Sequence, residues 1–555
     1  MKKYRTYILI AVPIILFNLI AVFGADILLA DDAAHYFRLT EGTLFKIKFI
    51  HLFLGTIINE TTYTIMGLSP ELIRGIYVLF VMVPLSCLIY YLFQKKMGFP
   101  GVAAYSAAVL PNILPAQFQI PAFVNGTQVL LGLIAVAACL LFSFKYLDHQ
   151  AQKNWKPLLM AAFLYLLATL VTDQPVFSFP VLVFAIWGYH KLNRKHLFLA
   201  VSFSLVFLHK AAWIVLLPRG STHMAETSIS GALKRLGQYF SAMLPLPQIS
   251  PEGEFIILLA IVFCSIIVTG LFFYMKNHNE GFTILKPFAH LSHKKFIFYI
   301  YGFLFIWLVS NIIVFITVSP RPFRVRYSYY AAYGLNALLA LSLYPILAKI
   351  FRSKKKLVTI AFAVLILITG WFRITQLKSH YDRLNADQAM IIENLNRFQF
   401  PENSQIVIYS TYGGNFWGDW YQSSGHLRYM LKRNDINGFI GNKGRKYFDF
   451  YDPFDVRSRG FGKAHWMRGL DINRPLFLFV EKNKEFKQYE YALQWKEKTG
   501  KAEWTIFHFD KKTGKESLLL RGIGSDDYYS TLARLRSKGI SQNDILWGGT
   551  ISKIF

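Results

Sequence analysis

Residues 7–38 read YILIAVPIILFNLIAVFGADILLADDAAHYFR, an apolar run that ends at Gly24 and is soon followed by two adjacent aspartates. The run is long enough to cross the hydrocarbon core of a bilayer, which takes about 20 apolar residues. It is longer than the apolar part of a signal peptide, and no clear small-residue cleavage site precedes the aspartates. We therefore predict a spanning helix over 7–24, with Asp31 and Asp32 just beyond its end.

Apolar runs of similar length recur as far as residue 373, and the mean hydropathy of the chain is +0.34. Runs of roughly 17–22 residues have the length of a membrane-spanning helix. The sequence predicts a polytopic α-helical membrane protein with about eleven spans. These are 7–24, 71–93, 101–118, 127–144, 158–172, 175–189, 197–217, 254–275, 296–318, 329–348 and 357–373.

The charges of the loops predict the orientation of the chain. Residues 1–373 contain 32 Lys and Arg but 12 Asp and Glu. With the N-terminus in the cytoplasm, the cytoplasmic loops hold 20 of these basic residues against two acids, a net +18, whereas the other side carries +2. This asymmetry is the positive-inside pattern of plasma-membrane proteins. An odd number of spans then places residues 374–555 outside the cytoplasm.

The overall charge of +28 is spread over short loops, which argues against nucleic acid as a partner. All three cysteines lie inside predicted spans, so no disulfide is expected outside the membrane. Together with the Lys- and Ile-rich composition, this favours a bacterial plasma membrane.

Two domains are expected. Residues 1–373 form the catalytic membrane domain, with long outer loops at 25–70 and 218–253, and an amphipathic segment at 45–54 is expected to lie in the interface. Residues 374–555 carry 28 basic and 20 acidic residues and no long apolar run. Helical periodicity at 384–398, buried strands at 405–409 and 475–480, and alternation at 504–509 predict a mixed α/β domain there.

Asp31 and Asp32 are the first candidate for chemistry. Few acids occur in the membrane part, and adjacent carboxylates repel each other, so such a pair favours a proton-handling, metal-binding or sugar-binding site. A carboxylate near a reacting hydroxyl is a general base. If the segment is helical, His35 and Arg38 follow at spacings that suit a phosphate or metal contact. The alternative is a solvated loop with an aspartate cap.

Three charged or titratable residues lie within or between the predicted spans. Asp173 occupies an outer turn, where it either faces a cavity or caps the helix that starts near Pro175. His209 and Lys210 fall inside the seventh span, and an ammonium there is costly unless it faces a wet or anionic cavity. Lys210 is a candidate for contacting a lipid phosphate, and snorkelling to the interface is the alternative.

Cations also gather at predicted outer loops. Arg321, Arg324 and Arg326 lie within six residues at the outer end of the ninth span, followed by Tyr327. Guanidinium groups bind phosphate in a forked geometry, although an aromatic belt with headgroup contacts explains the same pattern. A weaker set of candidates in the second long loop comprises Arg219, His223 and Glu226.

An acidic pair after the first span, many spans and an outer C-terminal domain resemble the GT-C superfamily of integral-membrane glycosyltransferases. The resemblance covers the architecture of the whole chain, and specific residues only in 26–38. It implies transfer of a sugar from a polyprenyl-phosphate carrier to an acceptor glycan, lipid or protein outside the cytoplasm, with inversion and with Asp31 or Asp32 as base. It allows, without requiring, a divalent metal such as Mg or Mn at Asp31, Asp32 and His35.

Two other functions fit the sequence less well. A polysaccharide polymerase or ligase that acts on polyprenyl-pyrophosphate glycans also uses outer arginines, but usually carries its large domain between spans. A lipid or glycan transporter or flippase tends to show internal repeats, and none is visible. The central expectation is that the tandem carboxylates and the outer cations line one wet cleft.

Overall fold

The computed structural model divides the chain into two compact units. The helical unit comprises Met1–Ala25, Ile47–Thr62 and Ser69–Tyr381, and the C-terminal unit comprises Asp26–Lys46, Tyr63–Leu68 and Asp382–Phe555. The described residues are 2–24, 31–42, 54, 57–58, 61, 64, 70–118, 124–148, 155–216, 229–246, 253–276, 282–312, 328–352, 354–410, 420–442, 474–498, 501–523, 525–540 and 545–548. The division differs from the predicted boundary after residue 373, because part of the first outer loop groups with the C-terminal unit.

Each of the eleven predicted spans falls on a helix of the helical unit. These helices are α1 (Lys2–Phe23), α4 (Pro70–Tyr77), α5 (Val83–Tyr91), α6 (Gly101–Ile113), α8 (Val124–Asp148), α9 (Lys156–Val171), α10 (Phe179–Trp187), α11 (Arg194–Leu216), α13 (Gly253–Lys276), α14 (His293–Ser310), α16 (Tyr329–Ile350) and α17 (Lys355–Leu395). π-Helical turns join α4 and α5 into one rod that continues to Lys96. Six helices of the described residues are long and apolar enough to cross a membrane, which confirms the polytopic helical class.

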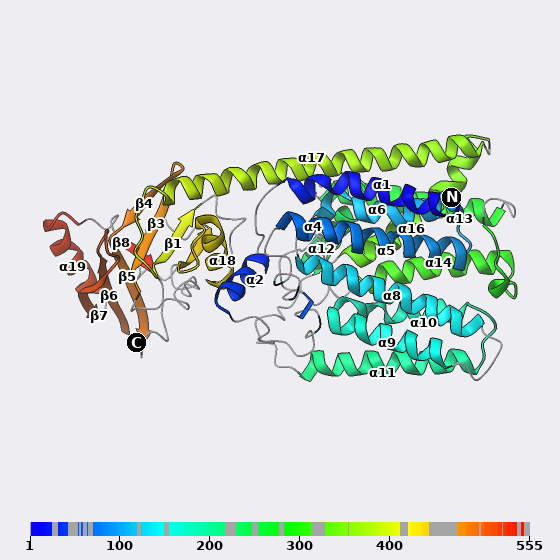
Figure 1. Cartoon of the computed structure of the whole chain (residues 1–555), viewed down its shortest axis with the longest axis horizontal. Helices are drawn as coiled ribbons and strands as arrows, with labels where there is room; N and C mark the ends of the chain where they lie inside the picture. Colours follow the sequence, from blue (N-terminus) through cyan, green and yellow to red (C-terminus); the bar gives the residue numbers. More distant parts are fainter. Residues whose placement is uncertain are drawn as a thin grey trace. The chain divides into compact units, whose positions relative to one another are not determined.

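The helices of this unit run alongside one another (Figure 1). Hydrogen bonds between buried polar groups connect some of them. Arg373 of α17 is buried and donates to the carbonyl of Leu114 at 2.6 Å and to the side-chain oxygen of Asn18 at 2.5 Å. The Leu114 carbonyl follows the end of α6, where carbonyls lack helical partners. One guanidinium therefore ties α1, α6 and α17 together.

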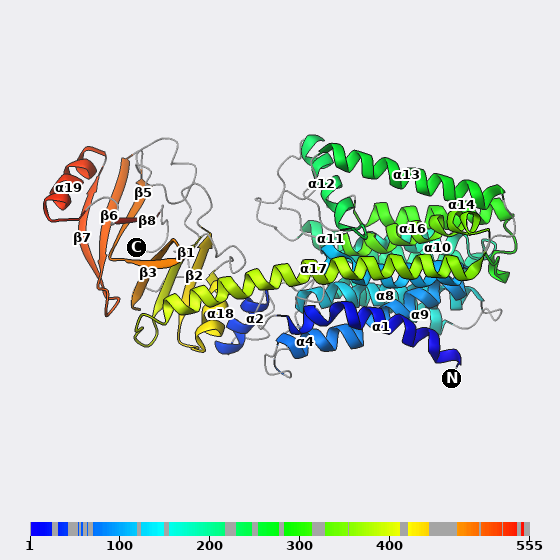
Figure 2. The same cartoon turned by 90° about the horizontal axis from the view of Figure 1, so that it is seen from above.

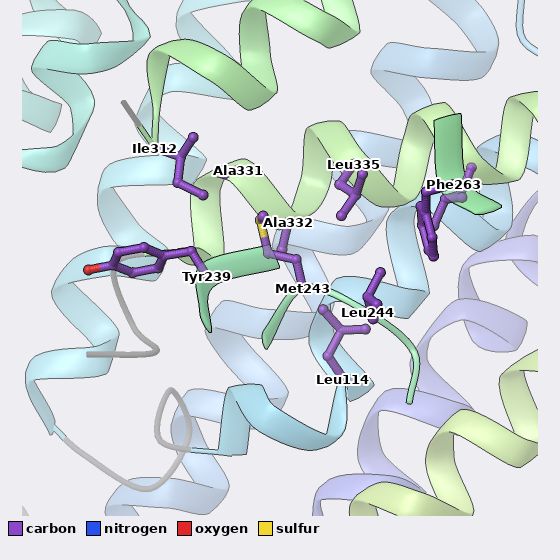
Figure 3. Packing of buried hydrophobic residues seen from close by; sticks show 10 residues of the cluster. Leu114, Tyr239, Met243, Leu244, Phe263, Ile312, Ala331, Ala332 and Leu335 are labelled. Carbon is purple, nitrogen blue, oxygen red and sulfur yellow. The ribbon is translucent and has the colours of Figure 1, made fainter. Parts of the chain in front are cut away.

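The predicted loop 218–253 contains a helix, α12 (Ile229–Ala242). The chain that leaves α12 packs into the core, where Met243 and Leu244 meet Phe263 of α13 and Leu335 of α16 (Figure 3). Asn336 of α16 also donates to the carbonyl of Met243 at 3.0 Å. The second half of this loop is therefore a packed part of the helical unit.

The C-terminal unit contains a four-stranded sheet of β1 (Gln405–Ser410), β2 (Asn437–Asn442), β3 (Leu476–Lys482) and β4 (Glu485–Tyr489). The strand order is β2-β1-β3-β4, with β1 parallel to both neighbours and β4 antiparallel to β3. Strands β1 and β3 are the two predicted buried strands, and α18 (Trp420–Leu431) makes the crossover from β1 to β2 that parallel pairing requires. The predicted helix at 384–398 is the end of α17.

A second sheet joins β5 (Tyr491–Lys498), β6 (Lys501–Phe509), β7 (Glu516–Ile523) and β8 (Ile545–Gly548) in the order β7-β6-β5-β8 (Figure 2). Helix α19 (Ser525–Ser537) follows β7. The alternating segment predicted at 504–509 lies in β6, and the mixed α/β class of the C-terminal part is confirmed.

Candidate active site

The two candidate aspartates begin a helix, α2 (Asp31–Thr40), which belongs to the C-terminal unit. Carboxylates in the first turn of a helix are stabilised in their ionised form, because the first N–H groups and the helix dipole present positive charge there. The structure confirms that the segment with the acidic pair is helical over residues 31–40. The position of the pair also suits a base that must be ionised before it accepts a proton.

Helix α2 packs on α18, and both views show them side by side (Figures 1 and 2). Ala33 of α2 is buried and clusters with Tyr429 of α18. The rings of Tyr36 and Tyr429 meet edge to face, with 5.5 Å between centroids. The closest approach is at Gly425, where a Cβ would lie 1.8 Å from the carbonyl oxygen of Ala33. Any side chain at position 425 would therefore push α2 away.

Arg428 of α18 is the polar anchor of this contact, and only 1% of its side chain is exposed. It donates to the hydroxyl of Thr40 at 2.6 Å and to the carboxylate of Glu41, at the end of α2. Its Nε donates to the carbonyl of Ile436 at 2.8 Å, and its guanidinium lies 4.5 Å from the ring centroid of Phe37. One arginine thus joins α2 to the chain entering β2.

Helical geometry separates the positions of α2 into two faces. Positions 33, 36, 37 and 40 contact α18 and fall on one stripe, the i, i+3, i+4, i+7 pattern of a buried helix face. At about 100° per residue, positions 31, 35 and 38 fall on the opposite face, and position 32 falls on the flank. Of the two aspartates, Asp31 therefore shares its face with His35 and Arg38.

A second aspartate pair in the same unit includes an aspartate that stabilises the start of a helix. Asp526 and Asp527 lie in the first turn of α19. The carboxylate of Asp527 accepts a hydrogen bond from the backbone N–H of Ile523 at 3.0 Å, which fixes the turn between β7 and α19. This pair illustrates the capping alternative for Asp31 and Asp32, and it provides a matched control for experiments.

In the helical unit, Lys210 and Asp173 form an ion pair at 3.2 Å between Nζ and Oδ1. Lys210 is 1% exposed, whereas Asp173 is 34% exposed. Asp173 precedes the short 3₁₀ helix Gln174–Ser178 but makes no side-chain cap to it. Lys210 is therefore buried and paired with Asp173 rather than snorkelling to the interface, and the Asp173 side chain does not cap the 3₁₀ helix. His209, the next residue along α11, has an exposed side chain.

Tyr330 of α16 and Thr172, the residue before Asp173, both lie close to Gly132 of α8. At Gly132 of α8, a Cβ would lie 2.4 Å from the Tyr330 hydroxyl and 2.9 Å from Thr172. Tyr330 therefore lies near the residue that precedes Asp173.

Seven of the predicted site residues lie outside the described residues: Arg219, His223, Glu226, Arg321, Arg324, Arg326 and Tyr327. The predicted interfacial segment 45–54 also lies outside them, except for Leu54.

The acidic pair and Lys210 belong to different units, so the expectation that they line one cleft stays a prediction. Among the described residues, no three His, Cys, Asp or Glu side chains are grouped to hold a metal ion. Positions 31 and 35 are one helical turn apart, a spacing that suits two ligands of one metal. A divalent ion bound there would need further ligands from outside α2.

Sequence reasoning missed Gly425 and Arg428, the two residues that fix α2. The signal was present, because Gly425 interrupts a helical segment and Arg428 follows three residues later on a neighbouring face. Nothing in the segment names a partner 388 residues earlier in the chain, however. The contact requires the tertiary structure.

Among solved structures, the chain is similar to the oligosaccharyltransferase of Archaeoglobus fulgidus, crystallised in complex with zinc and sulfate. The match has 15% identity and a TM-score of 0.40, and it covers 79% of this chain and 62% of that chain. The present chain thus spans less than two thirds of the length of that enzyme. No family model and no curated protein matches the sequence. At this level of likeness, activity and substrates must be inferred from the residues of this chain.

Proposed function

We propose that this protein is a membrane glycosyltransferase that moves a sugar from a polyprenyl-phosphate carrier to an acceptor hydroxyl on the extracytoplasmic face. The observation that carries the proposal is the acidic helix α2, which follows the first apolar helix and is held on α18 by a buried arginine. The sequence resemblance to the GT-C superfamily supplies the reaction class. The fold alone would fit other membrane proteins.

Asp31 is the proposed general base. Its position lies opposite the docked face of α2 and shares that face with His35 and Arg38, whereas position 32 lies toward the flank. The helix N-terminus favours an ionised carboxylate, and ionisation is a condition for accepting the proton of the acceptor.

The reaction is a single displacement with inversion. The acceptor oxygen attacks the anomeric carbon and forms the new glycosidic bond, while the bond from that carbon to the carrier phosphate oxygen breaks. The bonding electrons leave with the phosphate, and the acceptor proton passes to Asp31. Cationic groups near the leaving phosphate would stabilise its developing charge. A divalent ion, where bound, would add positive charge at the same place, and the proposed displacement requires no step on it.

The leaving phosphate is assigned to the arginines rather than to Lys210 alone. The pair of Lys210 with Asp173 carries no net charge, so it attracts an anion less than an isolated ammonium would. Arg321, Arg324 and Arg326 precede Tyr330 in the sequence, and Tyr330 lies close to Gly132, as does Thr172, the neighbour of Asp173. We propose that these arginines grip the carrier phosphate with Lys210 as support. Arg219, His223, Glu226, His209 and Tyr327 are proposed as further substrate contacts.

The test is a donor panel with the purified protein. Native protein is incubated with polyprenyl-phosphate sugars and a mixture of acceptors, and release of sugar-free carrier phosphate is measured. Turnover by the native protein and its loss in Asp31→Asn support the proposal. Full turnover in both Asp31→Asn and Asp32→Asn removes the catalytic role of the pair.

The same assay separates the alternatives. A polymerase or ligase would release carrier pyrophosphate from pyrophosphate-linked glycans and leave monophosphate donors intact. A flippase would move labelled carrier across vesicles without breaking a glycosidic bond. Either result contradicts the proposed monophosphate-dependent transfer.

A further inference from the structure

We propose that Arg428 of α18 is the positioning residue that holds the acidic helix α2 for catalysis. This inference rests on the proposed function for its kinetic part. Its structural part, that α18 holds α2, can be tested without any turnover.

The first argument is the nature of the contact between α2 and α18. Gly425 brings the two helix backbones together, because the carbonyl of Ala33 occupies the place of a side chain. Ala33, Tyr36 and Tyr429 form one apolar cluster beside this close approach. A ten-residue helix is marginal by itself in water, so tertiary packing must supply most of the stability of α2. The packing described here comes from α18.

The second argument is the charge of the anchor. A guanidinium that is 1% exposed is costly unless its donors are satisfied. Arg428 meets this condition with Thr40 and Glu41 at the end of α2 and with Ile436 and Asn437 at the start of β2. Two of these four partners are therefore lost when α2 leaves. A buried arginine left half satisfied strongly disfavours the undocked state.

The third argument is the direction in which the anchored helix presents its acids. The anchor lies at the C-terminal end of α2, at Thr40 and Glu41, whereas Asp31 lies at the N-terminal end. Ten residues of helix span about 15 Å. Loss of this anchor would let α2 pivot about the contact between Ala33 and Gly425, and misplacement of the acidic end by about 1 Å can cost a factor of about 100 in rate.

The experiment combines hydrogen exchange and kinetics on the full-length protein in detergent micelles. The variants are Arg428→Gln, Arg428→Lys and, as matched control, Arg433→Gln. Arg433 is an arginine of the same unit that pairs with Asp435 and binds the carbonyl of Phe400 instead of α2. We expect Arg428→Gln to lower amide protection across 33–42 at least tenfold and kcat at least tenfold, with donor KM within twofold of native. Arg428→Lys should recover part of the amide protection and part of kcat, and Arg433→Gln should lower neither.

Each other outcome contradicts a stated part. Unchanged protection of 33–42 in Arg428→Gln shows that Arg428 does not hold α2. Lost protection with turnover within twofold of native shows that holding α2 does not matter for catalysis. If no donor is turned over by the native protein, the proposed function fails, while the exchange result still decides whether α18 holds α2. Protection of the β1 amides reports folding, and Gly425→Ala replaces Arg428→Gln if that strand loses protection.

Discussion

Gly425→Ala tests the contact between α2 and α18 with a single methyl group. The added Cβ would lie 1.8 Å from the carbonyl oxygen of Ala33, and ordinary contact begins at 3.4 Å, so α2 must withdraw by about 1.6 Å. The Arg428 bond to Thr40, now 2.6 Å, would then be stretched beyond hydrogen-bonding range. Overpacking costs about 1–3 kcal/mol, and losing a hydrogen bond to a charged group costs about 1.5–3 kcal/mol.

The expected weakening of α2 docking is thus about 3 kcal/mol, or about a 100-fold increase in the undocked population. Alanine also favours the helical state of α18 over glycine by about 1 kcal/mol. The substitution should therefore loosen α2 without lowering the stability of the sheet beside it. That combination of opposite effects distinguishes a close-contact role of Gly425 from general destabilisation.

The assay is amide exchange of peptides from α2 and from β1 in native and Gly425→Ala protein. Gly75→Ala in α4 is the control, because a Cβ there would meet only Val22 at 3.5 Å. Faster exchange in α2, with β1 unchanged, supports the contact. Unchanged exchange in α2 would refute the reasoning, since a methyl group cannot share the space of a carbonyl oxygen.

Two further predictions concern charge. Asp173→Asn leaves a buried ammonium at Lys210, which should cost about 3 kcal/mol, whereas Lys210→Met leaves a partly exposed carboxylate and should cost less. In thermal unfolding in detergent, Asp173→Asn should have the lowest Tm, and the double variant should regain part of the lost Tm. Equal losses of Tm in both single variants would contradict this. Burial lowers the pKa of His426 in α18 to about 3. Its neutral form stabilises the C-terminal unit fully above pH 6.5, and at pH 5 we expect a loss of about 2 kcal/mol. Denaturant unfolding at pH 7.5 and pH 5.0 should show this difference in the free energy of unfolding of the native protein and a smaller difference in His426→Gln. An equal difference in the two proteins would contradict the prediction.

Much of the architecture follows from local sequence patterns. The spans are long apolar runs, and β1 and β3 are short apolar runs bounded by polar residues. Each of these elements can therefore be predicted from its local sequence. Helix α18 was not predicted, because the polar residues Gln422 to Gly425 interrupt its apolar periodicity. These residues serve tertiary contacts instead: Gly425 lies against Ala33 of α2, and the Ser424 hydroxyl bonds Gly438 of β2.

The candidate site was predicted only in part, for the same physical reason. The aspartates were visible as an unusual pair of like charges. Their assignment to the C-terminal unit depends on the packing of α2 against α18, a helix far away in the sequence, which no local pattern encodes. The cost of an ammonium in a span draws attention to Lys210, and the structure shows it buried and paired with Asp173. The sequence does not reveal this pair, because Asp173 lies 37 residues away in the chain and also fits the role of a helix cap.

The most direct measurement of the central claim compares two aspartate pairs in one preparation. Asp31→Asn with Asp32→Asn removes the pair on α2, and Asp526→Asn with Asp527→Asn removes the pair on α19, with the same change in charge. We predict that single-turnover release of carrier phosphate falls at least 100-fold in the first double variant, as expected for removal of a general base, and stays within twofold of native in the second. Equal rates in the two double variants would contradict the claim that the acids of α2 perform the chemistry.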